Sequence, residues 1–518
     1  MTWENSAITI TTLLPLAGAL LIVLMPSSKD RLIRALGIVI TGAALVLAVA
    51  IAIGFDYGAR EGLQFTLDAR WIDAINARYH VGIDGISMPL YVLTFLLSFL
   101  CAIYTWRYVP DPGRTKAFLA LMLLLETGMA GTFIAFDLIL FFVFWELVLV
   151  PMYFLIGIWG SSNREYAAIK FFLYTLFGSV FMLLGFLGMF FRSDIDPGPA
   201  VVHTFDILQL QDLGAAGVFS KGFQLVVFGA VALGFAVKVP MWPFHTWLSD
   251  AHTEAPTIGS VLLAGIMLKM GTYGFIRIAL PILPYGAQRY APWIGLLAAI
   301  GIVYASLACL AQRDLKRLIA FSSVGHMGFV MLGIATLTEI GIQAAIFGMV
   351  AHGVITGMLF FCVGSIYDRY HTREIAAIGG GMAQKMPKLA GIFAFVSIAS
   401  LGLPGLAGFW GEVMALLASF SPNTEQAGLS VGLFRVYMVA GGIGTILTAG
   451  YFLWMLQRVN LGTMPEKWKE TGFRDTLTVE WVAWLPLLVL TVGLGLFPRI
   501  VFGMTDDAVS GVLHMFGI

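Results

Sequence analysis

This sequence has little charge for its length. Only 12% of its 518 residues are charged, whereas an ordinary soluble domain carries about 25%. Hydrophobic residues make up 59%, which is more apolar surface than a soluble chain of this size can bury. The composition therefore excludes a disordered chain or an ordinary soluble enzyme and predicts a protein that crosses a membrane many times.

Cysteine is scarcer still, with three residues in the whole chain. Cys101, Cys309 and Cys362 each lie inside an apolar run, and no two of them share a motif. Disulfide frameworks, zinc knuckles and iron–sulfur clusters need several cysteines at set spacings, so the sequence supports none of them. The three cysteines are predicted to pack as small apolar side chains.

An excess of either charge is also missing, because 30 basic residues balance 30 acidic ones. A nucleic-acid partner is therefore not expected. The segment before the first apolar run contains no basic residue, and the first one, Lys29, follows that run. Cleavable signal peptides begin with a positive segment, so residues 8–25 are predicted to remain as the first membrane span.

Long apolar runs are what the sequence has in abundance. A run of about 17–25 such residues can cross a bilayer as a helix. We predict fourteen spans, at residues 8–25, 33–55, 87–108, 117–136, 138–159, 166–191, 222–249, 257–278, 291–310, 315–335, 340–366, 386–420, 432–458 and 480–502. The predicted fold class is therefore an all-α polytopic membrane protein. The weakest boundary is at Asp137, which alone interrupts a long apolar stretch.

Basic residues are unevenly shared between the two sides that this count defines. Alternate loops, beginning with the first, hold eighteen: Lys29, Arg31, Arg34, Arg107, Arg114, Lys116, Arg164, Arg313, Lys316, Arg317, Arg369, Arg373, Lys385, Lys388, Arg458, Lys467, Lys469 and Arg474. The other loops hold nine: Arg60, Arg70, Arg78, Arg192, Lys221, Arg277, Arg289, Arg435 and Arg499. Because basic residues favour cytoplasmic loops, this bias predicts both termini on the outer side of the membrane.

Two of the outer loops are long, at residues 56–86 and 192–221. Apolar and polar residues alternate over Gln64–Trp71, which predicts a strand of a short hairpin. On the inner side, residues 459–479 are polar, with Trp468 between two lysines. We expect this inner segment to lie on the membrane surface or against a partner.

Seven ionisable residues lie well inside the predicted spans. They are Glu126, Glu146, Lys238, Lys269, His326, His352 and Glu412. An ionised side chain at the bilayer centre costs at least about 2.5 kcal/mol, so such residues persist where they face the protein interior or a wet cavity. One alone is as readily a hydrogen-bonded structural residue, but seven together are typical of a proton relay. Lys170, near a helix start, is expected to reach the interface instead.

Two of the spans contain helix-breaking residues. One break lies at Pro240 and Pro243, beside Lys238, and the other lies at Pro404, before Glu412. Proline removes a backbone donor and clashes with the preceding turn of a helix. Paired broken helices of this kind are typical of transporters that are built from inverted repeats.

The spacing of the ionisable residues fits such a repeat. Glu146 precedes Lys238 by 92 residues, and His326 precedes Glu412 by 86. An odd number of helices in each unit would invert the second unit relative to the first. The predicted organisation is a three-helix segment with the outer hairpin at 1–116, five-helix units at 117–278 and 291–458, and an inner surface segment with the last span at 459–518.

The segment from Phe244 to Glu254 contains histidine and carboxylate side chains that a metal ion could use. Their spacing matches no familiar zinc or two-metal pattern, so no metal site is predicted. A polar loop that feeds protons toward Lys238 fits the segment better. The chain also lacks nucleotide-binding motifs and a serine–histidine–aspartate pattern, so no cofactor site is predicted on it.

Four longer motifs add a resemblance that covers nearly the whole chain. They run over Tyr79–Ser87, Phe144–Tyr153, Lys238–Leu248 and Phe321–Gly328. In these motifs the sequence resembles the antiporter-like subunits of respiratory complex I, the proton-translocating NADH:quinone oxidoreductase. The family has relatives in multisubunit cation/proton antiporters and membrane-bound hydrogenases. One of its three complex I members carries glutamate on the broken twelfth helix where the others have lysine, and Glu412 points to that member.

The resemblance implies a role for each buried ionisable residue. Glu146 and Lys238 would form a coupled pair in a first half-channel, and Lys269 would connect, through His326 and His352, to Glu412 on the exit side. Glu126 is a weaker candidate for the same relay.

The resemblance also implies where the other parts of the machinery lie. FMN, iron–sulfur clusters, the NADH site and the quinone site would belong to partner subunits, and adjacent antiporter-like chains would be neighbours in a bacterial plasma membrane. Three alternatives stay open from the residues: a subunit of a Na+/H+ antiporter, a membrane-bound hydrogenase subunit, and a structural scaffold.

Overall fold

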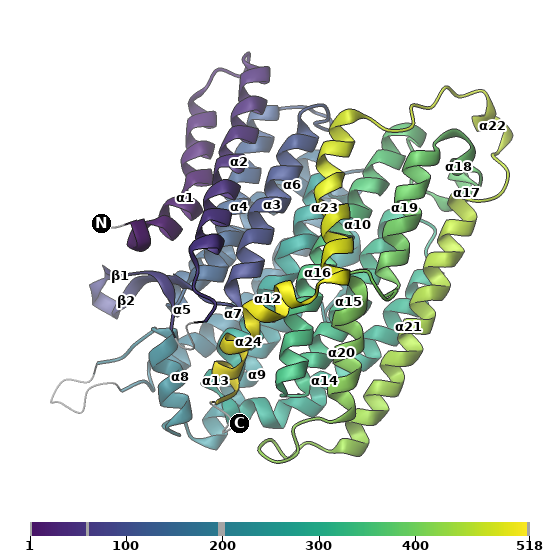
Figure 1. Cartoon of the computed structure of the whole chain (residues 1–518). Helices are drawn as coiled ribbons and strands as arrows, with labels where there is room; N and C mark the ends of the chain where they lie inside the picture. Colours follow the sequence, from purple (N-terminus) through teal and green to yellow (C-terminus); the bar gives the residue numbers. More distant parts are fainter. Residues whose placement is uncertain (1–2, 59–61, 195–201, 515–518) are drawn as a thin grey trace.

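The computed structural model describes residues 3–58, 62–194 and 202–514, and helices make up most of them (Figure 1). Thirteen helices in this described part are long and apolar enough to cross a membrane. Two shorter apolar helices follow one another and together form a further span, broken in the middle. The prediction of fourteen spans and an all-α membrane fold is confirmed. Arg60, predicted in an outer loop, lies outside the described residues.

The N-terminal part contains three spanning helices and a hairpin. These elements are α1 (Trp3–Leu24), α2 (Asp30–Gly54), β1 (Gln64–Ile72), η1 (Asp73–Ile75), β2 (Ala77–Ile83) and α3 (Ser87–Thr105). The strands pair antiparallel, with Leu67 opposite Val81 and Asp68 opposite His80. The strand predicted from the alternating pattern over Gln64–Trp71 is therefore confirmed.

The next group of spans contains Glu126, Glu146, Lys238 and Lys269. Its elements are α4 (Thr115–Ile134), α5 (Leu138–Leu147), α6 (Leu149–Trp159), α7 (Arg164–Phe190), the surface helix α8 (Ile207–Ala215), α9 (Lys221–Lys238), α10 (Thr246–Glu254), α11 (Thr257–Leu262), η2 (Leu263–Met267), α12 (Leu268–Gly274), η3 (Phe275–Ala279) and α13 (Leu280–Ile282). Helices α5 and α6 form one bent span, and α9 and α10 form the broken seventh span.

The remaining spans contain His326, His352 and Glu412. Their elements are α14 (Pro284–Leu310), α15 (Leu315–Ala335), α16 (Glu339–Tyr370), α17 (Ile375–Ile378), α18 (Met382–Lys385), α19 (Pro387–Ser400), α20 (Gly408–Phe420), α21 (Val431–Val459), α22 (Glu466–Lys469), α23 (Thr478–Leu496) and α24 (Arg499–His514). The last span ends at Leu496, six residues before the predicted limit, because the chain turns at Phe497 and Pro498 into α24.

The loops rich in basic residues gather at one end of the molecule, which we call the basic face. It comprises residues 25–29, 106–114, 160–163, 311–314, 371–386 and 460–477. Contacts join these loops to one another: Lys116 donates to the carbonyl of Met25, and Arg373 donates to the hydroxyl of Ser161. Figure 1 shows α17, α18 and α22 at this end, and the hairpin and α8 lie toward the opposite end, the hairpin face.

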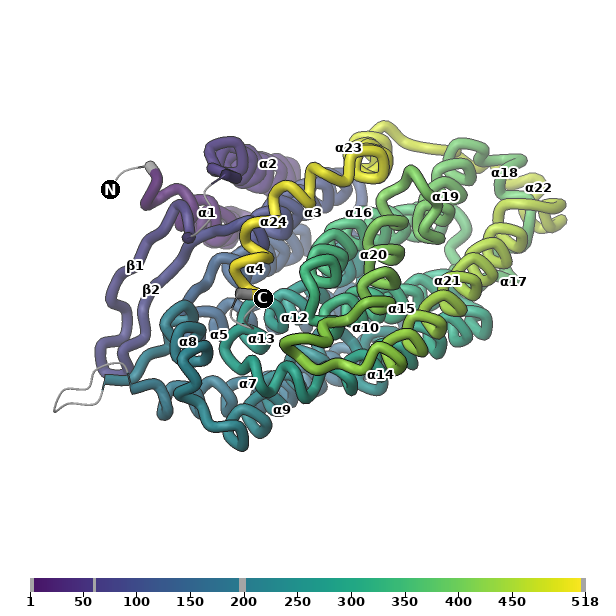
Figure 2. Tube along the Cα trace, turned by 60° about the horizontal axis from the view of Figure 1, so that its bottom comes forward, coloured from purple at the N-terminus to yellow at the C-terminus, as the bar shows by residue number. Residues whose placement is uncertain are grey.

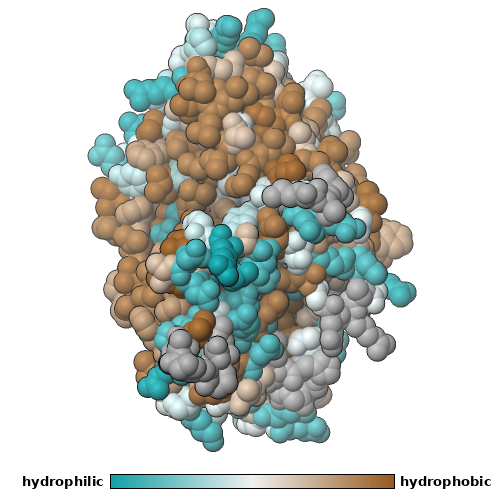
Figure 3. All heavy atoms as spheres, turned by 90° about the vertical axis from the view of Figure 1, so that its left-hand side faces the viewer, coloured by the Kyte–Doolittle hydropathy of each residue, from teal (hydrophilic) through white to brown (hydrophobic). Residues whose placement is uncertain are grey.

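Burial separates a central group of spans from an outer group. The spans from Thr257 to Ile282, from Leu315 to Ala335 and from Glu339 to Tyr370 are 94–100% buried over their most apolar stretch, whereas α2 and α21 are 33% buried. The tube view shows α12, α15 and α16 in the interior and α2 and α21 on the outside (Figure 2). Figure 3 shows one side of the molecule, hydrophobic over its upper part and hydrophilic lower down. The apolar outer surface is the one that lipid covers in a spanning protein.

The polar segment 459–479 lies across the basic face of this chain. Trp468 of α22 donates its indole N–H to the carbonyl of Ala377 and contacts the rings of Tyr370 and Phe473. The segment therefore packs on the surface of its own chain, and its placement on the membrane surface or against a partner stays a prediction.

Candidate functional site

Lys269 lies in an irregular part of the eighth span. The short helix α12 is flanked by two π-helical turns, η2 and η3, in which the backbone hydrogen bonds are one residue longer than in an α-helix. The ammonium group of Lys269 is fully buried and donates to the carbonyl of Ala264, inside the first π turn. Such turns occur often at functional sites, and no feature of the sequence had indicated them.

From Lys269 a series of contacts crosses the core of the molecule. Its Nζ lies 2.7 Å from Nδ1 of His352 on α16. The ring of His352 lies 5.8 Å, centroid to centroid, from the ring of His326 on α15. Nδ1 of His326 lies 2.8 Å from Oε1 of Glu412 on α20. We call Lys269, His352, His326 and Glu412 the four-residue relay.

Both halves of the broken twelfth span contact His326, α19 through Ser400 and α20 through Glu412. Ser400 is the last residue of α19, and its hydroxyl lies 2.9 Å from Nε2 of His326. Gly402 follows in the break with φ +77°, and a Cβ there would lie 3.3 Å from Oε2 of Glu412. A glycine at this position therefore permits both the left-handed turn and the close approach of the carboxylate.

A small cavity of about 30 Å³ adjoins the relay. His326, His352, Ser400 and Glu412 line it together with apolar side chains. This volume accommodates a water molecule, and polar partners are present on several sides. Water can therefore complete the gap between the two histidine rings, where no direct hydrogen bond is present.

Glu146 and Lys238 form a different kind of site. Lys238 is the last residue of α9, and Glu146 is the second-last residue of α5, two residues before the bend at Val148. Pro151 explains this bend, because its ring conflicts with the carbonyl of the residue four positions earlier, Leu147. The two charges interact, but no ion pair within 4.0 Å joins them in the described structure.

The Lys238 ammonium is 1% exposed and lies 4.8 Å from the centre of the Trp145 ring. Neither this ammonium nor Oε1 of Glu146 has a hydrogen-bond partner among the described residues. The helix break leaves the carbonyl of Val237 free, and the buried indole of Trp247 donates to it. Lys238 is thus held by its contact with the Trp145 ring and by the hydrogen bond beside it at Val237. One polar atom of each member of the pair has no partner among the described residues.

Glu126 is fully buried on α4, and neither of its oxygens has a partner within the described part of the chain. No described contact connects it to the relay or to the Glu146–Lys238 pair. The structure therefore brings together four of the seven predicted residues by a chain of contacts, places two as a separate pair, and leaves Glu126 apart.

Two basic residues that the sequence assigned to loops are buried instead. Arg277 lies in η3 and pairs with Asp84, which precedes α3. Lys316 lies in the first turn of α15 and donates to the carbonyl of Ala255 at the end of α10. The loop assignment was wrong because each residue finds a fixed oxygen that only the folded chain supplies. Lys170, which was expected to reach the membrane interface, is partly exposed and pairs with Asp250 of α10 at 2.6 Å.

Sequence reasoning also missed partners of the predicted residues. Ser400 was not singled out, although it lies four residues before Pro404. His252, part of the polar segment after Lys238, is fully buried with both ring nitrogens unpartnered in the described structure, and it stacks on Phe360 at 4.7 Å. Within the residues that the structure describes, no three histidine, cysteine or acidic side chains gather as a metal site.

Residues 135–437 match the family model for the membrane-spanning NADH:quinone oxidoreductase/Mrp antiporter proteins. The chain is 41% identical to the NADH-quinone oxidoreductase subunit M of Rhodobacter capsulatus over 99% of this chain and 97% of that one.

The chain belongs to this family of antiporter-like membrane subunits.

Solved structures of the antiporter-like family share the same fold. A chain of respiratory complex I from Thermus thermophilus, solved with bound NADH, superposes with a TM-score of 0.85 at 28% identity, covering 99% of this chain and all of that one. A chain of the Mrp complex from Dietzia sp. gives 0.81 at 22% identity, covering 99% and 98%. The family resemblance in the sequence motifs is thereby confirmed, and so is the expectation drawn from Glu412, since the relative above is a subunit M.

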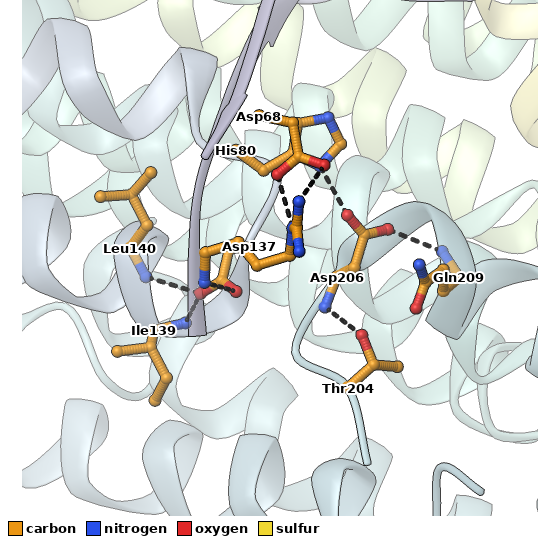
Figure 4. Close-up of polar contacts among 9 residues, drawn as sticks. Asp68, His80, Asp137, Ile139, Leu140, Thr204, Asp206 and Gln209 are labelled. Atoms are coloured by element: carbon orange, nitrogen blue, oxygen red, sulfur yellow. Dashed lines mark hydrogen bonds and ion pairs between the residues drawn. The ribbon is translucent and has the colours of Figure 1, made fainter. Parts of the chain in front are cut away.

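A second polar cluster of this antiporter-like chain lies on the hairpin face (Figure 4). Nδ1 of His80, on β2, lies 2.5 Å from Oδ2 of Asp206, the residue that caps α8. Arg78 binds Asp68 of β1 at 2.6 Å, and its backbone N–H donates to Asp137, which caps α5. Asp137, the weakest predicted boundary, thus ends one span and begins the next.

Backbone contacts continue the hairpin into the group of spans that holds Glu146. Val81 pairs with Ala135, and Asp137 pairs with Asp206. Burial by itself lowers the pKa of His80, but the hydrogen bond and charge of Asp206 outweigh it, so the pKa of His80 is raised. Burial raises the pKa of Asp137, and its backbone hydrogen bonds offset that only in part. The cluster was not predicted from the sequence, because its members come from three distant segments.

Proposed function

We propose that this chain moves protons across the membrane as the M-type antiporter-like subunit of an NADH:quinone oxidoreductase. The observation that carries the proposal is the four-residue relay, which links a lysine, two histidines and a glutamate through the buried core. Buried ionisable side chains cost free energy in a membrane protein, and a row of four, joined by two direct contacts and one gap that water can bridge, is typical of proton transfer. A purely structural scaffold has no need of such a row.

In the proposed relay, each member holds or releases a proton to its neighbour. Lys269 exchanges a proton with Nδ1 of His352, a water in the adjoining cavity bridges to His326, and His326 exchanges with Glu412. Ser400 fixes the ring of His326 through Nε2 and so keeps Nδ1 directed at the carboxylate. The proton leaves from Glu412 at the broken twelfth span.

The Glu146–Lys238 pair is proposed as the site that couples this relay to the rest of the enzyme. A nearby carboxylate stabilises the ammonium form of Lys238, so moving the two apart favours release of its proton. Because the two groups interact, they titrate as a pair and not one by one. A conformational or charge change from a neighbouring subunit would provide the movement.

The chemistry that drives transport is proposed for other subunits. FMN, iron–sulfur clusters and quinone would be bound there, and adjacent antiporter-like chains would lie on either side of this one. The three cysteines of this chain are buried singly, with no thiol partner, which does not suit cluster binding.

The proposed setting is a bacterial plasma membrane, with the basic face toward the cytoplasm and both termini outside, since basic residues favour the cytoplasmic side. We also propose the units 117–278 and 291–458 as inverted repeats. In support, each unit has an ionisable residue on its second helix and another at the broken fourth one.

Co-purification tests this function directly. The tagged chain, extracted in mild detergent, should carry NADH:quinone reductase activity together with flavin and iron–sulfur absorbance. Purification with small membrane subunits alone, and no redox activity, would instead assign the chain to a cation/proton antiporter.

A further inference from the structure

Two cavities adjoin on the basic face, away from the relay. One, of about 430 Å³, lies among the ends of α3 and α16 and the segment before α23. The other, of about 530 Å³, lies between the start of α2, the end of α3 and the start of α23. Arg107 and Val479 line both, so the two form one cleft, which we call the arginine cleft.

Two of the arginines that line this cleft are used by the protein itself. Arg34 binds Asp30 at 2.8 Å and also donates to backbone carbonyls at the end of α3. Arg369 binds both oxygens of Glu480 at 2.8 Å. These two ion pairs form part of the walls of the cleft. Each guanidinium charge is compensated by the carboxylate that it binds.

Three further arginines of the cleft have no such partner. Arg31, Arg107 and Arg474 are exposed, and among the described residues their guanidinium groups form no ion pair or side-chain hydrogen bond. The remaining acid of the cleft, Asp368, is half-buried and accepts a hydrogen bond from Tyr104 at 3.4 Å. The accessible charge of the cleft is therefore positive.

Apolar helix faces lead away from this positive cleft. Helix α2 exposes Leu32, Val39, Val46 and Ile53 at intervals of seven residues, and α23 exposes Val482, Leu485, Val489 and Leu496. Figures 1 and 2 both show α2 and α23 on either side of α3. Trp106, which also lines the cleft, is 44% exposed, as is typical of tryptophans at the headgroup level.

We propose that the arginine cleft binds the headgroup phosphate of an anionic glycerophospholipid from the leaflet on the basic face. Arg107, shared by both cavities, would bind the phosphate, with Arg31 and Arg474 on either side. A planar guanidinium group binds phosphate oxygens through two hydrogen bonds, and basic pockets between transmembrane helices hold anionic headgroups. The acyl chains lie along α2 and α23. The proposal depends on the membrane position of the chain and not on its proton relay.

Lipid retention by the intact complex tests this site. The complex is purified in mild detergent, washed with phosphatidylcholine, and the phosphatidylglycerol and cardiolipin that remain are counted per complex by mass spectrometry. The double variant Arg31→Gln/Arg107→Gln should lose one anionic lipid, and its affinity for phosphatidylglycerol in phosphatidylcholine nanodiscs should fall by about 25-fold, about fivefold for each guanidinium removed.

Arg313→Gln is the matched control, because Arg313 is exposed on the same face but does not line the cleft. It should retain the lipid. Arg31→Lys/Arg107→Lys keeps the charge without the planar fork, so it should retain an intermediate amount, and it carries the test if the glutamine variant does not assemble.

Three results would overturn the proposal. Equal lipid retention in the glutamine variant and the control would show that the cleft binds no lipid. Displacement by millimolar inorganic phosphate would indicate a soluble phosphate ligand, since a lipid is also held by its acyl chains. Loss of a neighbouring subunit at unchanged lipid content would assign the cleft to an acidic protein surface.

Discussion

The four-residue relay and the Glu146–Lys238 pair use the same residue types in two different ways. In the relay, Lys269 and Glu412 each lie within 2.8 Å of a histidine nitrogen. In the pair, Lys238 contacts the face of Trp145, and its ammonium and one oxygen of Glu146 have no partner among the described residues. In the proposed function, the first arrangement would pass a proton through two direct contacts and one water-bridged step between the histidines, whereas the second has no direct contact between its charged groups.

This difference suggests a division of tasks within one chain. A buried polar atom without a partner costs about 1–3 kcal/mol, and both sites contain such atoms: Nε2 of His352 and Oε2 of Glu412 in the relay, Nζ of Lys238 and Oε1 of Glu146 in the pair. In the pair the ammonium group itself is unpartnered, so we expect the pair to be the more easily changed by its surroundings. The relay is fixed by contacts from four helices and by the serine next to the break. We therefore expect the pair to respond to neighbouring subunits and the relay to transmit the result.

The largest expected effect is loss of transport when the pair is removed. Lys238→Ala or Glu146→Ala should leave the complex assembled and lower NADH-driven proton pumping by about 100-fold or more, since each removes a proton-carrying group. Pumping is measured in inverted membrane vesicles, with native gels as the assembly readout. Glu165→Gln, an exposed acid on α7, is the control. Normal pumping in either alanine variant would show that the pair is dispensable.

Shortening the glutamate side chain by one methylene group should distinguish the relay from the pair more sharply. Glu412→Asp withdraws the carboxylate from His326 by about 1.5 Å and should lower pumping about tenfold, because a direct contact tolerates little misplacement. Glu146→Asp should cost less than about threefold, because a water-mediated contact readjusts. The readout is the ratio of the two pumping rates. Equal losses would mean that both sites depend on direct contact.

Helix packing offers a third way to disturb the relay alone. A Cβ on Gly411 would lie 2.7 Å from Cα of Gly348, so Gly411→Ala should push α20 away from α16. We expect a loss of about 1–3 kcal/mol in stability, seen as a lower unfolding temperature, together with reduced pumping. Gly450→Ala has open space around it and should leave both unchanged. An unaltered unfolding temperature in the Gly411 variant would contradict the close packing.

The smallest expected effect concerns the hairpin face. His80 has a raised pKa in the folded chain, so its pair with Asp206 stabilises the fold below the usual histidine pKa of about 6.5 and loses this effect as pH rises through the folded value. The protection factor for hydrogen exchange at the N–H of Phe136, which donates to the carbonyl of His80, should fall over that range once the intrinsic base-catalysed rate is divided out. His80→Gln should abolish this pH dependence of the protection factor.

His203→Gln serves as the matched control for that measurement. His203 lies on the same face, and its ring pairs with Asp194 at 3.3 Å and not with Asp206. It should keep the pH dependence of exchange at Phe136. If the two variants behave alike, the effect does not arise from the His80–Asp206 pair.

Much of the fold was predictable because the bilayer imposes simple demands. Each span needs a long apolar run, and proline disfavours a continuous helix, so the spans and both breaks followed from residues such as Pro240 and Pro404, although Pro15, Pro292 and Pro486 lie inside unbroken helices. Buried charge is costly enough that Lys238 and Lys269 stood out as candidates. The same reasoning failed for Arg277 and Lys316, which lie at the ends of apolar runs. Such a position does not show whether the folded chain buries the charge beside a partner.

The sequence by itself determined which residues form the spans, where the proline breaks lie and most of the ionisable groups that are buried, but not Arg277, Lys316 or His252. Only the tertiary structure decided which of those groups touch. The order Lys269, His352, His326, Glu412 depends on the packing of α12, α15, α16 and α20, whose contacts join residues up to 86 positions apart. The π turns beside Lys269 and the hairpin pairing with Ala135 also appear only on folding. The local sequence pattern indicates which side chains are costly to bury. The partner that each of them finds depends on how helices distant in sequence pack together.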